Sequence, residues 1–97
     1  MITAVAIQQA MKGKEQQLVE LMATLTAQVK ANEPGCTLFL YVKSIDKPQT
    51  YVVIEQYKDQ AAFDFHHQTS YLSNFIPKMM GCLVKAPEVV TCDDVFG

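Results

Sequence analysis

Two strand-like segments, residues 37–43 and 51–57, carry large apolar side chains on both of their alternating faces. A strand with one face in water alternates apolar and polar residues, and neither segment does so. In the first segment Leu38, Leu40 and Val42 alternate with Phe39 and Tyr41, and in the second Val52 and Ile54 alternate with Tyr51, Val53 and Tyr57. A fold for this chain must therefore cover both sides of the sheet that holds these strands.

The rest of the chain predicts helices and strands separated by single glycines and prolines. The predicted elements are a strand over 2–11, a helix over 14–31, the two segments above as an antiparallel hairpin, a helical region from 58 to 80 and a last strand over 83–92. This β-α-β-β-α-β order predicts a ferredoxin-like α+β fold, with helices layered on an antiparallel sheet. The 97 residues leave room for one domain, which we place over residues 1–97.

Several residues mark where the helices begin and end. Leucine, methionine and valine recur at helical spacing from Leu18 to Val29, which predicts an amphipathic first helix. Asp59 is placed to cap the second helical region, and Gly81 closes it. A proline inside a helix removes a hydrogen bond, so we expect Pro77 to break the helix before Lys78.

The second apolar face of the sheet predicts a partner. Two helices cover only one face of a four-stranded sheet, and exposing large apolar side chains on the other costs roughly 1.5–3 kcal/mol each relative to burial. We therefore expect a homodimer in which two copies of the chain place their sheets against each other. The alternative is a monomer whose exposed tyrosines and valines are ordinary scattered surface residues.

Charge and composition exclude several classes of protein. The net charge is −2 and all eight basic residues are lysines, so no basic surface or guanidinium group is available and we expect no nucleic-acid binding. No apolar run approaches the roughly 20 residues that span a bilayer, so we expect no membrane insertion and no export signal. The odd set Cys36, Cys82 and Cys92 predicts reduced thiols in the cytoplasm.

Three pieces of the sequence together resemble the antibiotic biosynthesis monooxygenase family. They are Glu33-Pro34-Gly35-Cys36, the segment YVVIEQYKDQAAF at 51–63 and the segment HHQTSYLSNF at 66–75. In the last, His66, Thr69, Leu72 and Phe75 fit the family pattern, and Tyr71 stands where a second histidine is common. Glu55 and Tyr57 match a Glu-x-Trp pair, with tyrosine in place of tryptophan.

The resemblance implies a dimeric α+β barrel and a cofactor-independent monooxygenase that acts on a small aromatic or quinol-type molecule. Such chemistry needs a base, because the substrate donates its own electrons once it is deprotonated. His66 is the candidate base, and its alternative role is that of a core histidine bonded to the backbone. His67 lies about 100° around the same helix and is expected to face solvent.

Other side chains are candidates for the same site. Glu55 lies on an apolar strand face, where it can orient His66, orient a substrate hydroxyl or make a structural hydrogen bond to a loop. The candidate substrate-binding residues are Tyr57, Tyr71, Phe63 and Phe75, although aromatic residues in such positions are commonly core. The spacing of histidines and cysteines predicts no metal site, and we expect no cofactor.

Two other functions remain open on the sequence. One is a non-catalytic dimer that binds a small hydrophobic molecule. The other is an isomerase of a phosphorylated autoinducer-type metabolite, which would need cationic contacts that only Lys43, Lys47, Lys58, Lys78 or Lys85 could give.

Overall fold

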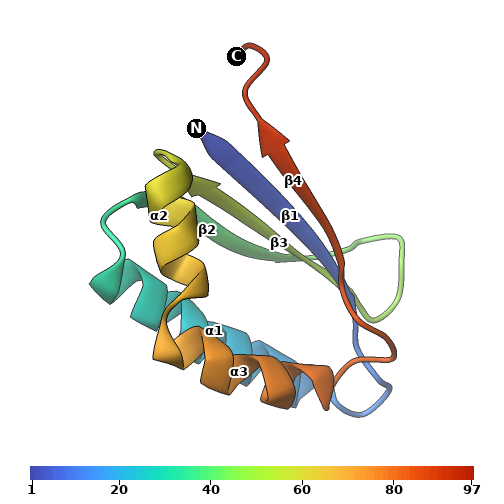
Figure 1. Ribbon diagram of the computed structural model, residues 1–97. Coiled ribbons are helices and arrows are strands. Elements are labelled where there is room, and N and C mark those ends of the chain that lie inside the picture. Colours follow the sequence, from blue (N-terminus) through green and yellow to red (C-terminus); the bar gives the residue numbers. More distant parts are fainter.

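A computed structural model describes residues 1–97 and confirms the predicted ferredoxin-like α+β fold (Figure 1). Its elements are β1 (Ile2–Gln9), α1 (Glu15–Asn32), β2 (Cys36–Lys43), β3 (Thr50–Tyr57), α2 (Gln60–His67), α3 (Ser70–Met80) and β4 (Glu88–Asp93). All helices lie on one side of the sheet, and the other side carries none (Figure 1). None of the helices combines the length and the apolar character that crossing a bilayer requires.

The four strands form one antiparallel sheet in the order β2-β3-β1-β4. Ala4 of β1 pairs with Glu55 of β3, and Gln8 pairs with Tyr51. All four of these side chains therefore lie on the same side of the sheet, because side chains of directly paired residues share a face. That side faces the helices, as the burial of Ala4, Gln8 and Tyr51 shows.

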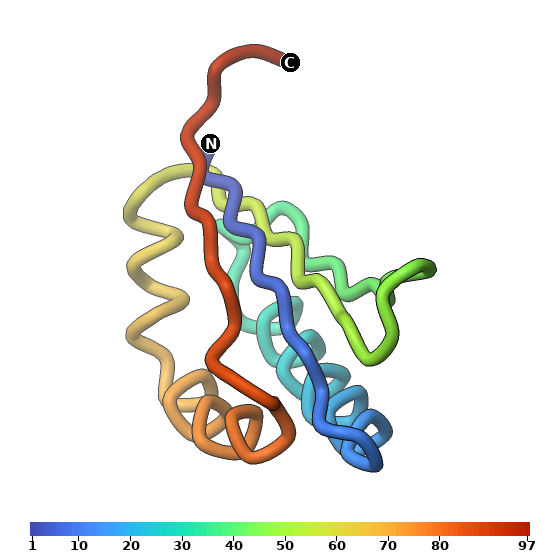
Figure 2. The backbone as a smooth tube through the Cα atoms, turned by 90° about the vertical axis from the view of Figure 1, so that its right-hand side faces the viewer, coloured from blue at the N-terminus to red at the C-terminus, as the bar shows by residue number.

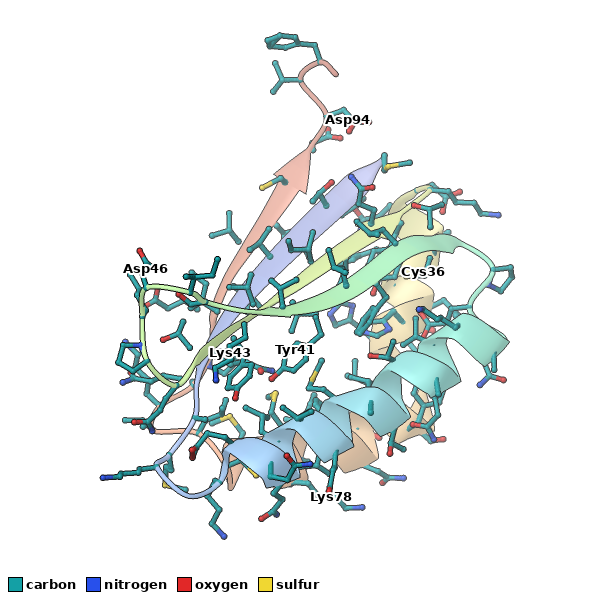
Figure 3. The ribbon with its side chains drawn as sticks, turned by 180° about the vertical axis from the view of Figure 1, so that it is seen from behind. Cys36, Tyr41, Lys43, Asp46, Lys78 and Asp94 are labelled. Atoms are coloured by element: carbon teal, nitrogen blue, oxygen red, sulfur yellow. The ribbon has the colours of Figure 1, made fainter.

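The core lies between this inner face and α1. Leu18, Met22, Leu25 and Val29 of α1 are buried, which confirms the amphipathic helix that their spacing predicts. They pack against Phe39, Val53 and neighbouring residues in a single cluster of buried side chains. Figure 3 shows Tyr41 in the same layer, between the sheet and α1.

The second helical region is divided in two. Asp59 caps α2 by accepting a hydrogen bond from the backbone N–H of Ala62 at 2.8 Å, as predicted. Thr69 precedes α3 without capping it through its side chain. The predicted break at Pro77 is wrong, because α3 continues through Pro77 to Met80. Phe75 and Met79 are buried on either side of the proline. Their packing stabilises the helix where proline cannot donate a backbone hydrogen bond.

The last strand is shorter than predicted. The segment from Leu83 to Pro87 contributes only an isolated bridge between Leu83 and Ala10, and β4 begins at Glu88. Proline has no N–H to donate to a strand neighbour, so regular pairing starts immediately after Pro87. The chain then runs past β4 in a short tail whose end projects beyond the sheet (Figure 2).

The outer face of the sheet is apolar and has no cover from this chain. The strand register places eight large side chains on it, which we call the outer apolar face: Val5, Ile7, Leu38, Leu40, Val42, Val52, Ile54 and Val90. In Figure 3 the side chains on this face point away from α1. The two-faced character of β2 and β3 is therefore real, and the helices account for only one of the two faces.

Candidate functional site

A cavity of about 320 Å³ lies between the inner face of the sheet and the helices. Every helix and strand contributes to its wall, together with the segment just before β4, and 13 of its 19 lining residues are hydrophobic. The lining residues are Ala4, Ala6, Gln8, Met22, Leu25, Phe39, Val53, Glu55, Phe63, His66, His67, Leu72, Phe75, Ile76, Met79, Met80, Pro87, Val89 and Thr91. A mostly apolar wall with a few polar groups is typical of a small-molecule site.

His66 is the centre of the polar groups in this wall. It lies in the last turn of α2, and its residue is only 3% exposed. Its ring Nδ1 lies 3.0 Å from both carboxylate oxygens of Glu33, which is itself 3% exposed. Carboxylates are acceptors when ionised, so Nδ1 carries the proton and donates to Glu33. The free lone pair of a neutral His66 is then on Nε2.

Glu55 lies on the other side of the same ring. Its Oε1 is 3.8 Å from Nε2 of His66, too long for a hydrogen bond but close enough for electrostatic attraction to a protonated imidazole. The same oxygen accepts a hydrogen bond from the hydroxyl of Tyr57 at 2.6 Å. Burial, followed by the neighbouring Glu55 carboxylate, raises the pKa of Tyr57, so this hydroxyl remains a donor.

Glu33 occupies a position that is unfavourable for a carboxylate. It is the residue that follows α1, where the helix dipole disfavours negative charge, and it is removed from water. Two donors offset this: Nδ1 of His66 and the hydroxyl of Tyr71, which donates to Oε2 of Glu33. Burial, reinforced by this contact with Glu33, raises the pKa of Tyr71 to about 12.

Gly35 lets Glu33 approach His66. A Cβ atom at Gly35 would lie 2.5 Å from Cβ of Ala62 in α2, so only glycine permits this approach. The backbone N–H of Lys58 also donates to the carbonyl of Gly35 at 2.9 Å. The Glu33-Pro34-Gly35 turn is therefore packed directly on α2, which holds His66 in its last turn.

The arrangement is suited to general base chemistry at Nε2 of His66. Glu33 fixes the tautomer and the ring orientation through Nδ1, as the acidic member does in a histidine-based triad. Once Nε2 accepts a proton, the charge lies between the two carboxylates of Glu33 and Glu55 and at the C-terminal end of α2, where positive charge is favoured. No group of three or more histidine, cysteine, aspartate or glutamate side chains is arranged to hold a metal ion.

The predicted site residues do not all lie in the same place. His66, Glu55, Phe63 and Phe75 line the cavity, whereas Tyr57 and Tyr71 lie outside its lining and hydrogen-bond to Glu55 and Glu33. Their proposed catalytic and substrate-binding roles remain predictions.

The second histidine, His67, is exposed as a residue, as expected, although part of it reaches the cavity wall. Its Nδ1 lies 2.9 Å from the carbonyl oxygen of Phe63, one turn earlier in α2. The two histidines therefore have different surroundings, and only His66 is held by a carboxylate.

Sequence reasoning missed the role of Glu33, which it used only as part of the Glu33-Pro34-Gly35-Cys36 segment and not as a partner of His66. The one available signal was an acidic residue at the C-terminal end of a helix, a position that needs a compensating partner.

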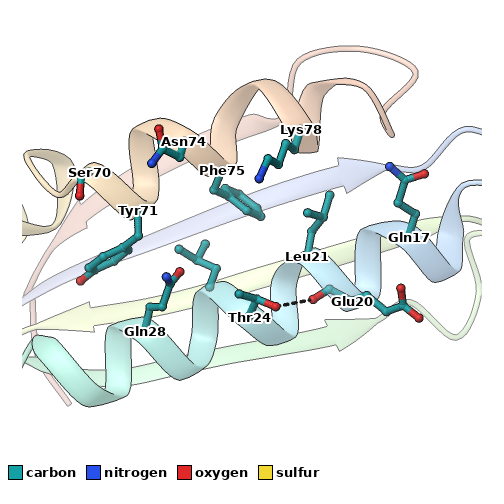
Figure 4. Close-up of a pocket in the computed structure, with 11 residues that line it drawn as sticks. Gln17, Glu20, Leu21, Thr24, Gln28, Ser70, Tyr71, Asn74, Phe75 and Lys78 are labelled. Carbon is teal, nitrogen blue, oxygen red and sulfur yellow. Dashed lines mark hydrogen bonds between the residues drawn. The ribbon is translucent and has the colours of Figure 1, made fainter.

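A larger hollow of about 590 Å³ lies elsewhere, between α1 and α3 (Figure 4). Gln17, Gln28, Asn74 and Lys78 line it together with other residues, and Figure 4 shows them projecting from the two helices. It contains neither His66 nor either of the carboxylates beside it. The smaller cavity is the candidate site because the buried His66 and Glu55 line it, whereas the titratable residues that line the larger hollow are Glu20, Tyr71 and Lys78.

Known proteins resemble this chain in both sequence and fold. The family model "Antibiotic biosynthesis monooxygenase" matches residues 1–78. A crystal structure of a "putative antibiotic biosynthesis monooxygenase" from Caulobacter crescentus is 29% identical and aligns with a TM-score of 0.93, covering 98% of this chain and 90% of the other.

Two curated sequences are also similar. The "putative monooxygenase YcnE" of Bacillus subtilis is 28% identical over 65 residues, which cover 67% of each chain. The "uncharacterized protein sll1783" of Synechocystis is 26% identical over 76 residues, which cover 78% of this chain. This match covers 51% of the Synechocystis protein, so the present chain spans only about half of that relative's length.

Adding a side chain at Gly35 should move α2 away from the Glu33 turn. We expect Gly35→Ala to lower the free energy of unfolding by about 1–3 kcal/mol, because the new methyl overlaps Ala62. The double variant Gly35→Ala/Ala62→Gly removes the overlapping methyl and should recover part of this loss. Urea unfolding of the three proteins measures the effect, and equal stability of Gly35→Ala and the unchanged protein would contradict it.

The buried tyrosine hydroxyls should make stability fall at high pH. A pKa raised in the folded state favours folding below the ordinary tyrosine value of 10.0, and this contribution is lost as the pH rises toward about 12. Tyr41, Tyr57 and Tyr71 share this direction. Phenolate absorbance should therefore appear at higher pH in the folded protein than in guanidinium. Identical titration curves in the two states would count against these contacts.

Proposed function

The chain belongs to the antibiotic biosynthesis monooxygenase family, and we propose that it is a cofactor-independent monooxygenase for a small phenolic or quinol-type aromatic molecule. The observation that carries the proposal is the placement of His66. Its Nδ1 is held by Glu33 in the protein interior, and His66 is one of the residues that line a mostly apolar cavity. A fixed base beside a mostly apolar cavity suits the deprotonation of a phenol.

The reaction needs dioxygen as co-substrate and no further reductant. His66 removes the hydroxyl proton of the substrate, and the phenolate transfers an electron to dioxygen. The two radicals combine at a ring carbon that carries a hydrogen, ortho or para to the oxygen, and the resulting peroxide takes back the proton held by His66 to become a hydroperoxide. Loss of the remaining hydrogen from that carbon with cleavage of the O–O bond releases water and leaves a quinone. One oxygen atom of dioxygen enters the product and the other leaves as water.

The two carboxylates have separate roles in this proposal. Glu33 is a positioning residue, because it keeps the proton of His66 on Nδ1 and leaves Nε2 free. Glu55, 3.8 Å from Nε2, stabilises the imidazolium after proton transfer. Phe63 and Phe75 supply flat apolar surface for the ring of the substrate.

The alternative chemistry on a phosphorylated metabolite has less support. A phosphate group is bound by cationic side chains or by backbone N–H groups at a helix start, and no lysine lines the cavity. All five candidate lysines lie outside its lining: Lys43, Lys47, Lys58, Lys78 and Lys85.

We propose that the outer apolar face is covered by a second copy of the chain. Eight large apolar side chains from all four strands lie on it, and Leu40 is 44% exposed and Val90 59% exposed in the single chain. A contiguous apolar surface on a whole sheet face is typical of a permanent interface. The same surface on each copy gives a self-complementary two-fold contact.

We place the protein in the cytoplasm. All three cysteines are free in the structure, and Cys92 is exposed, as expected in a reducing compartment. Burial, followed by the charge of nearby Glu33, raises the pKa of Cys36, which keeps that thiol protonated.

Replacing the proposed base should abolish turnover while leaving the cavity able to bind. We expect His66→Ala to lower oxygen consumption with a panel of quinols about 100-fold or more. The shift in melting temperature that the same quinols produce should persist, because the other lining side chains keep their identity. Ligand-induced shifts without oxygen uptake in the unchanged protein would instead indicate a non-catalytic binding protein.

A charge on the outer apolar face should separate the proposed dimer. We expect Ile54→Lys to sediment as a monomer at micromolar concentration, because Ile54 pairs with both Val5 and Leu40 in the middle strands. Ile45→Lys is the matched control, since Ile45 is fully exposed in the turn before β3 and lies off this face. A monomer in the unchanged protein, or a dimer in Ile54→Lys, would contradict the proposed interface.

A further inference from the structure

A buried amide, that of Gln8, lines the cavity and has no part in the proposed proton transfer. Gln8 is on the inner face of β1 and is only 2% exposed. It pairs with Tyr51, whereas Glu55 pairs with Ala4, four residues back along the same strand. At roughly 3.3 Å per residue the two backbone positions are about 13 Å apart. Gln8 therefore lies toward the end of the cavity opposite Glu55 and His66.

The orientation of this amide is fixed by Tyr41. The hydroxyl of Tyr41 donates to Oε1 of Gln8 at 2.7 Å. Burial raises the pKa of Tyr41, so the hydroxyl keeps its proton and remains a donor. Because Oε1 is held in this way, the NH₂ group of Gln8 points to the other side.

The NH₂ group has only weak acceptors within the protein. Its Nε2 lies 3.4 Å from the sulfur of Met79 and 3.7 Å from the sulfur of Met22. Thioether sulfur is a poor acceptor, and a buried donor without a good partner is costly. All three residues belong to the cavity wall. An oxygen atom of a ligand at this place would replace a weak sulfur contact with a stronger bond.

We propose that Gln8 is a specificity-determining residue that donates to an oxygen atom at the far end of the ligand from the group that His66 deprotonates. The ligand class is then an aromatic molecule with an ionisable hydroxyl at one end and an acceptor oxygen, phenolic or carbonyl, at the other. This inference rests on the proposed function, from which it takes the class of ligand. It does not require that the ligand be turned over. A buried amide selects for such an oxygen because a ligand that lacks it leaves the donor poorly satisfied.

Two probes without turnover test the role of Gln8. Naphthalene-2,6-diol has hydroxyls at opposite ends of its rings, and 2-naphthol lacks one of them. In anaerobic titrations we expect the unchanged protein to bind the diol about threefold to tenfold more tightly than the naphthol, the value of one hydrogen bond. Gln8→Met removes the amide at similar size and should bring the ratio of the two dissociation constants close to one.

Two further variants keep the test decisive. Gln9→Met makes the same change at the next residue, which is exposed and on the opposite face of β1, and should keep the preference for the diol. If Gln8→Met does not fold because Tyr41 loses its acceptor, the double variant Tyr41→Phe/Gln8→Met removes both polar groups and gives the same readout.

Three results would overturn the inference: equal binding of both probes by the unchanged protein, a preference that survives in Gln8→Met, or no binding of either probe. These results are independent of oxygen uptake. Loss of the preference in Gln8→Met together with full activity of His66→Ala would support the role of Gln8 and reject the proposed base.

Discussion

The buried contact between Glu33 and His66 is the constraint on which the rest of the site depends. Glu33 follows α1 and His66 lies in the last turn of α2, so a 3.0 Å contact between their side chains also fixes how these two helices meet. Neither group is stable alone in this position, since each would be a buried polar group without a partner. Gly35 makes the contact possible by allowing the intervening turn to lie against Ala62.

Tyrosine hydroxyls donate hydrogen bonds to polar side chains at three places between the helices and the sheet. Tyr71 donates to Glu33, Tyr57 to Glu55 and Tyr41 to Gln8. Each hydroxyl satisfies an oxygen atom of a polar side chain on an otherwise apolar surface. The cavity consequently keeps an apolar wall with few polar groups, and each of these groups has a fixed orientation.

Most of the fold was predictable, and the errors have local causes. Periodic apolar residues located α1 and the hairpin to within one or two residues. At Pro77 the packing of Phe75 and Met79 outweighed the lost backbone bond, so the helix did not end where its local chemistry suggests. The last strand began late because Pro87 cannot pair, which a pattern of valines alone does not reveal.

The sequence by itself determined the order of the elements and the two apolar faces of the hairpin, because each follows from the periodicity of single helices and strands. Only the tertiary structure placed Glu33 beside His66, 33 residues away, and Gln8 beside Met22 and Met79. Periodicity states which way a side chain points from its own element. Which side chain it meets depends on how closely two elements pack, and at this site that distance was set by a glycine facing an alanine.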